Sequence, residues 1–207
     1  MNRTANIADE LAAAEIRAAL QGKRCWHAYV GIGCTFAMDL GKKILRDSQE
    51  RAWSEKHARN YPPEYRRYEG ESHLLVWCSW RIEDGKGPLA SSDNDFDVCE
   101  QAIRRLIGRA VREVRIGPGW DLRVEMSSGL TVTVFADHVG AKAIFDGNWE
   151  LWRPDQAYLI GTNLACEVID RQNRALSLQP RGGRWVVAPP GKGKQPSRPK
   201  AGAGSGR

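Results

Sequence analysis

The chain has 207 residues and carries 31 Lys and Arg against 25 Asp and Glu, a formal net charge of +6. That length is enough for one domain, or two small ones, with a sizeable core. A hydrophobic fraction of 42% and eight Trp exclude a wholly disordered chain. No run of about 18 apolar residues occurs, so we expect no transmembrane helix.

The basic excess is confined to the C-terminal end. Residues 171–207 contain nine Lys and Arg and no acid, which leaves 22 basic and 25 acidic residues in 1–170, a net charge of −3. A body with that charge argues against a basic nucleic-acid-binding domain.

The cysteines and the N-terminus predict a reducing compartment. The five cysteines are an odd number without a CxxC pair, and Met1–Asn6 is not followed by the apolar stretch of a secretory signal. We therefore expect a cytoplasmic protein with buried thiols. The spacing of Cys25, His27 and Cys34 matches no standard zinc pattern, and no phosphate-binding loop is present, so neither metal nor cofactor is expected.

The first predicted element is a helix over residues 7–21. Asn6 can cap its N-terminus, and Gly22 suits the position just after its C-terminus. One face of the helical period is apolar, made of Ile7, Leu11, Ala14 and Ala18. An alanine-rich helix of this kind packs against a neighbouring element or against another copy of the chain, so a homodimer through 7–21 is one expectation.

A strand and then a polar excursion follow. Period-two alternation over 34–40 predicts a half-buried strand within residues 26–44. Residues 42–69 hold eight Lys and Arg, five acids and few aliphatic residues, and Pro62-Pro63 ends any helix begun near Ser48. We interpret 42–69 as a solvated, partly helical excursion from the sheet.

The middle of the chain predicts a central strand, a helix and a hairpin. Residues 73–82 are apolar on both faces, which is typical of a covered strand. A helix is predicted over 97–107, with a core-facing stripe of Val98, Ala102, Ile103, Leu106 and Ile107 and with Gly108 after it. Strands at 122–126 and 130–135 flank the tight turn Ser127-Ser128-Gly129.

The remaining strands lead into a tail. Residues 149–152 and 157–160 predict a second hairpin, and 164–169, 175–178 and 185–187 predict further strands. From Pro189 onward, nine of 19 residues are Pro or Gly and none is large and apolar. Residues 189–207 are therefore predicted to form a disordered basic tail.

Two parts of the chain resemble each other. Residues 30–41 and 114–126 both carry glycine-marked strands, and each leads on to a Trp-bearing strand with an acidic turn, at 80–85 and 149–155. A duplicated β unit with sub-repeats at 26–93 and 109–161 would explain this. We predict one α+β domain over 1–188, with mainly antiparallel β-meander sheets and two short helices.

Short motifs between Glu71 and Gly161 carry a further likeness: Trp-Arg-Ile-Glu (80–83), Leu-Ala-Ser-Ser-Asp (89–93), Leu-Ile-Gly-Arg (106–109), Asp-Leu-Arg-Val-Glu (121–125) and Trp-Glu-Leu (149–151). With these motifs the segment resembles small uncharacterised bacterial β-rich proteins. Their style is that of immunity or defence-accessory proteins, and the resemblance implies a bacterial protein of that kind.

Few residues suggest catalysis. Cys25 and His27 lie two apart, so a regular strand would place thiol and imidazole on one face. Asp137 and His138 follow an apolar strand, where polar functional groups commonly lie. A packed Cys beside a surface His, and a turn without a role, are the competing interpretations.

The remaining candidates are cationic. Contacts to nucleic acid or another anion are expected to be weak and sequence-blind, and the side chains concerned are Arg66, Arg67, Lys192, Lys194, Arg198 and Lys200. Because no catalytic signature is present, we predict a non-catalytic bacterial factor that binds another protein, such as an immunity or anti-phage defence-accessory protein. The alternatives are a nucleic-acid-associated protein using the tail and 42–69, and an enzyme of unrecognised type.

Overall fold

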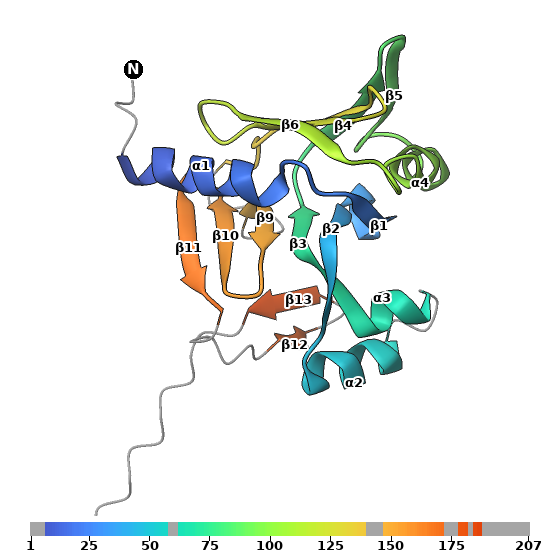
Figure 1. The fold of residues 1–207 in the computed structure, drawn as a ribbon, viewed down its shortest axis with the longest axis vertical. Helices are drawn as coiled ribbons and strands as arrows, with labels where there is room; N and C mark the ends of the chain where they lie inside the picture. Colours follow the sequence, from blue (N-terminus) through green and yellow to red (C-terminus); the bar gives the residue numbers. More distant parts are fainter. Residues whose placement is uncertain (1–6, 58–61, 140–146, 172–177, 182–183, 188–207) are drawn as a thin grey trace, which may run out of the picture. The chain divides into compact units, whose positions relative to one another are not determined.

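The computed structural model describes residues 7–57, 62–139, 147–171, 178–181 and 184–187 (Figure 1). Met1–Arg171 forms one compact unit, and Gln172–Arg207 forms another. The second unit contains the antiparallel hairpin of β12 (Leu178–Arg181) and β13 (Arg184–Val187). The predicted tail over 189–207, with its four cationic candidates, lies outside the described residues, as do residues 175–177.

The first unit contains two antiparallel sheets, which confirms the α+β prediction. Sheet 1 has the strand order β1-β2-β3-β9-β10-β11, and sheet 2 has the order β5-β4-β8-β7-β6. The strands of sheet 1 are β1 (Cys25–Val30), β2 (Phe36–Leu45), β3 (Tyr68–Val76), β9 (Gly147–Trp152), β10 (Gln156–Gly161) and β11 (Cys166–Asp170). Those of sheet 2 are β4 (Trp80–Asp84), β5 (Gly87–Ser91), β6 (Val111–Ile116), β7 (Leu122–Met126) and β8 (Thr131–Val134).

The two sheets repeat one topology. In sheet 1 the meander β1-β2-β3 is continued by the hairpin β9-β10, and in sheet 2 the meander β6-β7-β8 is continued by the hairpin β4-β5. Each half of the chain therefore gives a meander to one sheet and a hairpin to the other. This is the arrangement of a duplicated β unit, as the sequence echo predicts.

Matching contacts join the two halves where β1 meets β6. Gly22 N–H donates to Val111 O at 2.9 Å, and Gly108 N–H donates to Cys25 O at 2.7 Å. Both glycines have positive φ, +78° and +82°, a conformation that suits residues without Cβ. These bonds close one side of the assembly, so within the described residues β5 and β11 are the outer strands of the two sheets.

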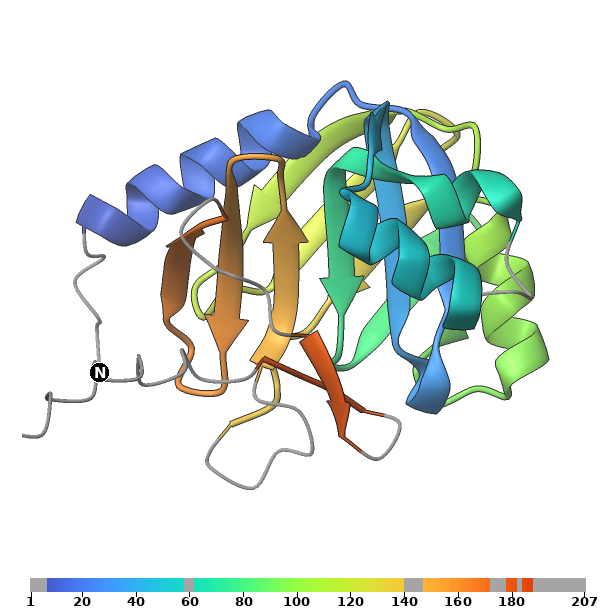
Figure 2. The ribbon, with the colours of Figure 1, turned by 90° about the horizontal axis from the view of Figure 1, so that it is seen from below.

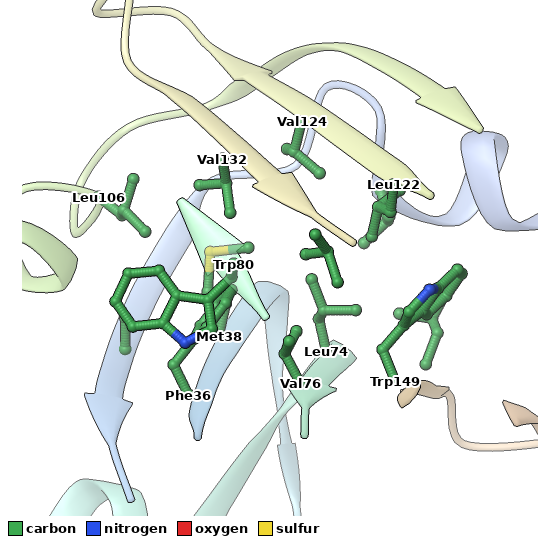
Figure 3. Packing of buried hydrophobic residues seen from close by; sticks show 14 of the residues in the cluster. Phe36, Met38, Leu74, Val76, Trp80, Leu106, Leu122, Val124, Val132 and Trp149 are labelled. Atoms are coloured by element: carbon green, nitrogen blue, oxygen red, sulfur yellow. The ribbon is translucent and has the colours of Figure 1, made fainter. Parts of the chain in front are cut away.

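The core fills the space between the sheets. Figure 3 shows Phe36, Met38 and Val76 of sheet 1 below Val124 and Val132 of sheet 2. These side chains occupy the inward-facing positions of both sheets. Burying an apolar side chain of this size stabilises the fold by roughly 1.5–3 kcal/mol.

A helix precedes each half. Helices α1 (Ile7–Leu20) and α4 (Phe96–Arg104) confirm the two predicted helices. Helix α4 buries Cys99, Ala102 and Ile103, whereas Val98 and Ile107 of its predicted stripe are exposed.

The core-facing side of α1 is not the apolar face chosen from the sequence. Its buried residues are Ala12, Ile16, Ala19 and Leu20. Ile7 and Leu11 are 74% and 62% exposed. Apolar residues occur on two sides of α1, so periodicity alone cannot tell which side packs.

The excursion over 42–69 is partly helical, as expected. It contains the end of β2, then α2 (Ser48–His57) and α3 (Pro63–Arg67). In Figure 2 both helices lie beside β2 and β3, and α3 contacts β3. The equivalent β7–β8 connection is a tight turn, so this insertion distinguishes the two halves.

The single strand predicted over 73–82 is two strands. Strand β3 ends at Val76 and β4 begins at Trp80, and the chain crosses from sheet 1 to sheet 2 between them. Alternate side chains stay buried through the crossing because the core lies between the sheets: Leu74, Val76, Cys78, Trp80 and Ile82. Among the described residues, none of the helices has the length and apolar character needed to cross a membrane.

Candidate functional site

Three titratable side chains meet on the outer face of sheet 1. Cross-strand register aligns His27 of β1 with Asp39 of β2, and Asp39 with His73 of β3. His27 Nδ1 lies 3.2 Å from Asp39 Oδ2, and His73 Nδ1 lies 2.9 Å from Asp39 Oδ1. We call these three residues the histidine cluster.

Asp39 is fully buried and held as a carboxylate. Gly70 N–H donates to Asp39 Oδ1 at 2.7 Å, in addition to the two histidine contacts. Burial alone would raise the pKa of Asp39, but the electrostatic interaction with His73 and the hydrogen bonds with His27, His73 and Gly70 outweigh it and lower the pKa below its usual range. The buried charge is therefore fully compensated by donors.

Aromatic and basic groups of the excursion cover the histidine cluster. The Tyr65 ring of α3 stacks on His27 with centroids 4.3 Å apart, and it meets Tyr29 edge-on at 5.2 Å. Arg46 lies 5.3 Å from the centre of the Tyr65 ring. The side chains of His27 and His73 consequently retain only 12% and 14% exposure.

The chemistry open to the histidine cluster is proton transfer. With Asp39 ionised, each ring presents an Nδ1 proton to the carboxylate, so Nε2 is the ring nitrogen that remains to exchange a proton. Among the described residues, no three His, Cys, Asp or Glu side chains are grouped so that they could hold a metal ion. A carboxylate between two imidazoles also has a purely structural use, because it ties β1, β2 and β3 together.

The predicted Cys25–His27 pair does not share a strand face. A β-bulge shifts the register between them, so that Cys25 pairs with Leu40 and His27 pairs with Asp39. Cys25 is buried in the core, and its thiol donates to the carbonyl of His27 at 3.3 Å. Burial and the nearby charge of Asp39 raise the pKa of Cys25 to about 12. The same-face expectation was wrong because it assumed a regular strand.

Asp137 and His138 lie in the connection that follows β8. Asp137 Oδ1 accepts from Ser79 N–H at 3.3 Å, and His138 N–H donates to Asn148 Oδ1 at 2.8 Å. The buried amide of Asn148 in turn donates to His138 O and to Gly161 O. These contacts fix the crossing between sheets, and they do not join either residue to the histidine cluster.

The outer face of sheet 2 carries charge in ordered rows. Register aligns Arg81, Thr133, Arg123 and Arg115 across the sheet. The next row aligns Glu83, Thr131, Glu125 and Glu113. We call the three arginines and three glutamates of these rows the charged face.

Ion pairs on the charged face run between the rows. Arg115 Nε lies 2.7 Å from Glu113 Oε1, and Arg123 Nε lies 3.4 Å from Glu125 Oε1. The hydrogen bonds from Arg115 hold the pKa of Glu113 below its usual range. Directly opposite residues on neighbouring strands nevertheless have the same sign, Arg115 with Arg123 and Glu113 with Glu125.

Two hollows border the charged face. One of about 460 Å³ is lined by Arg81, Glu83, Asp84, Arg123 and Thr131, among others. The other, of about 550 Å³, shares Asp84 and Gly85 with it and extends to Arg105, Arg109 and Leu130. None of the four candidate catalytic residues lines either hollow.

The two described cationic candidates lie at the end of α3. Arg67 is exposed, and its carbonyl accepts from Arg46 N–H at 3.0 Å. Arg66 is half-buried, and its Nε has no hydrogen-bond partner among the described residues. Neighbouring basic groups are paired with acids, as Arg46 is with Glu69 and Lys43 with Glu64. Contact with an anion through Arg66 and Arg67 stays a prediction.

Comparison of the chain with known proteins finds no relative. No family model, no curated protein and no solved structure matches this chain. The resemblance of 71–161 to small bacterial proteins therefore stays a prediction.

Sequence reasoning missed both clusters for different reasons. Asp39 and His73 lie far apart in the sequence, and only the register of β1, β2 and β3 unites them with His27. The charged face has a visible signal, since Arg81-x-Glu83, Glu113-x-Arg115 and Arg123-x-Glu125 each place opposite charges on one side of a strand.

Proposed function

We propose that this chain is a non-catalytic binding protein whose charged face docks a folded protein partner. The observation that carries the proposal is the placement of like charges directly opposite each other on an open sheet face. Like charges directly opposite each other on neighbouring strands destabilise a sheet. For folding, the ion pairs between the rows only offset that cost, whereas a partner with complementary rows would gain from the arrangement.

Comparison of the two outer faces supports this choice. The positions in sheet 1 equivalent to Glu113 and Glu125 are His27 and Asp39, and helix α3 covers them. The sheet 2 face keeps its arginine side chains 42–62% exposed. The topology is shared, so the fold does not require charged rows there.

The partner's chemistry follows from the two rows. A surface that carries basic side chains opposite Glu83, Glu113 and Glu125, and acidic ones opposite the arginines, would satisfy both. A polyanion such as nucleic acid would meet the glutamate row as well as the arginine row, which disfavours it. The immunity or defence role, the weak tail contacts with nucleic acid and the homodimer through 7–21 remain further proposals on partners.

Affinity capture with two charge-matched variants tests the proposal. One variant combines Arg81→Gln, Arg115→Gln and Arg123→Gln on the charged face. The control combines Lys56→Gln, Arg67→Gln and Arg104→Gln, three exposed positions elsewhere. The protein captured by the wild type is identified and purified, and its Kd for all three chains is measured at low and moderate salt.

We expect the charged-face variant to raise the Kd at least about tenfold and the control to leave it unchanged. Reversal of the partner's matching acidic residue together with Arg123→Glu should restore part of the affinity. Equal binding by both variants would contradict the proposal. Retention of nucleic acid alone by the wild type would favour the nucleic-acid alternative.

A further inference from the structure

Helix α1 presents a second surface, separate from the charged face. Figure 1 shows α1 lying across β10 and β11, with β6 on its other side, and α1 contacts both β6 and β11. Its buried side is fixed by Ile16 and Leu20, and by Tyr158 Oη, which donates to Glu15 at 2.7 Å. The opposite side carries Ile7, Leu11, Ala14 and Ala18, all of them exposed.

The duplicated half provides an internal control for this apolar stripe. The matching junction contacts of Gly22 and Gly108 align α1 with α4, so that Leu11 corresponds to Asp97 and Ala18 to Arg104. All four residues are exposed. Charged residues are thus tolerated at these two positions of the fold, so packing within the chain does not require Leu11 and Ala18 to be apolar.

The order of side chains along the stripe matches a second copy of itself. The two large residues, Ile7 and Leu11, occupy the N-terminal half, and the two small ones, Ala14 and Ala18, occupy the C-terminal half. When two such helices pack antiparallel about a two-fold axis, Ile7 lies against the partner subunit's Ala18, and Leu11 lies against the partner subunit's Ala14. Each large side chain then fills the space beside a small one.

Charge complementarity selects the same arrangement. The spacing of the stripe is that of a two-heptad coiled-coil seam, which Glu10 and Arg17 flank on one side. In the antiparallel pair these flanking positions meet, so Glu10 faces the partner subunit's Arg17 twice about the axis. A parallel pair would instead bring Glu10 beside the partner subunit's Glu15, a like-charge contact.

We propose that two copies of the chain associate through α1 as an antiparallel, two-fold symmetric helix pair. This deepens the homodimer proposed for residues 7–21 and is independent of the charged face. One helix pair buries less surface than the roughly 1,200 Å² of a stable complex. The association is accordingly weak and concentration-dependent, in the micromolar range.

Sedimentation of the full chain over a concentration series up to about 1 mM tests the proposal, because a micromolar dimer is saturated there. Leu11→Glu should weaken the dimer at least about 100-fold. Ile32→Glu makes the same change at another exposed hydrophobic residue and should leave the dimer intact. Thermal unfolding of both variants confirms that they are folded.

Charge reversals test the antiparallel geometry. Glu10→Arg alone and Arg17→Glu alone should each raise the Kd about tenfold, because each creates two like-charge pairs. An equimolar mixture of these two variants, or the double variant, should restore wild-type affinity.

Three results would overturn the proposal: a wild type that stays monomeric throughout, a Leu11→Glu variant that dimerises as well as the wild type, or single and double reversals with the same Kd. The charged-face triple variant should dimerise normally. Loss of partner binding through the charged face and loss of dimerisation through α1 can therefore be told apart.

Discussion

Trp80 and Trp149 occupy equivalent positions in the two halves of the chain, and each donates its indole N–H across the core to the same kind of acceptor. Trp80 Nε1 donates to Cys34 O at 2.6 Å, and Trp149 Nε1 donates to Trp120 O at 2.8 Å. Both acceptor residues have positive φ, +56° and +71°, in the turns β1–β2 and β6–β7. Each Trp therefore pins the turn of the opposite sheet, which holds the two sheets together.

Replacement of either Trp by Phe should destabilise the protein to a similar extent. Trp80→Phe leaves Cys34 O without its donor and creates a small cavity, and Trp149→Phe does the same at Trp120 O. We expect about 2–4 kcal/mol lost in each case, measured as the free energy of unfolding in urea. The matched control is Trp152→Phe, a half-buried Trp bonded to Glu150, with an expected loss of about 1 kcal/mol or less. A control loss equal to the others would refute the pinning role.

The duplication could be predicted from the sequence because its signals are local. Glycine-marked strands and Trp-bearing hairpins recur, and the tight turn at 127–129 fixes its hairpin without help from distant residues. The pairing of β3 with β9 and of β1 with the start of β6 could not be predicted, since nothing local specifies which strand lies beside which. The crossing at 77–79 could not be predicted either, because the alternation of buried side chains continues through it without a break.

The candidate sites depend on the pairing register of neighbouring strands, and the sequence did not predict that register correctly. One extra residue in β1 turns Cys25 inward while His27 stays outward beside Asp39. Helix α1 shows the comparable limit for helices, since Ile7 and Ile16 each belong to an apolar side and only tertiary packing decides between them.

Asp39 should make the stability of the protein sensitive to acid. Its pKa is lower in the folded chain than in the unfolded chain, so the unfolded state takes up the proton first as the pH falls. The stabilisation is complete near neutral pH and is lost progressively below about pH 5, through the ordinary titration range of Asp towards its lowered folded value.

Asp39→Asn tests that linkage. The amide presents a donor where the carboxylate accepted, so at least one of His27, His73 and Gly70 loses its acceptor. We expect the variant to be about 2–4 kcal/mol less stable at pH 7. Urea unfolding at several pH values should show the gap between wild type and variant narrowing as the pH falls. A gap that stays constant down to about pH 3 would contradict the assignment of the linkage to Asp39.

Gly70 should be intolerant of any side chain. A Cβ at this position would lie 2.5 Å from Leu40 N and 2.7 Å from Ser72 O, both backbone atoms that cannot move aside locally. Gly70→Ala should therefore cost about 1–3 kcal/mol and loosen the N–H that holds Asp39. The matched control is Gly85→Ala, where a Cβ meets nothing within 4 Å, with an expected change within about 0.5 kcal/mol. Thermal unfolding of both variants measures the difference, and equal midpoints would exclude the steric clash.

Thiol labelling tests the bulge that separates Cys25 from His27. If β1 were regular, the Cys25 thiol would lie on the outer face beside the imidazole, outside the core, and would react faster than a core thiol. In the structure Cys25 lies in the core, and burial with the charge of Asp39 raises its pKa to about 12. At pH 8 only about one molecule in 10⁴ then carries the reactive thiolate.

Cys25 should resist alkylation in the folded chain and react once the chain is unfolded in urea, as read by mass spectrometry of its peptide. Cys78, with a pKa raised to about 12 mainly by burial, is the matched internal control. Rapid labelling of Cys25 with protection of Cys78 would place the thiol on the outer face and remove the bulge. Because burial is the larger cause of the raised pKa, Asp39→Asn should leave Cys25 protected for as long as the variant stays folded.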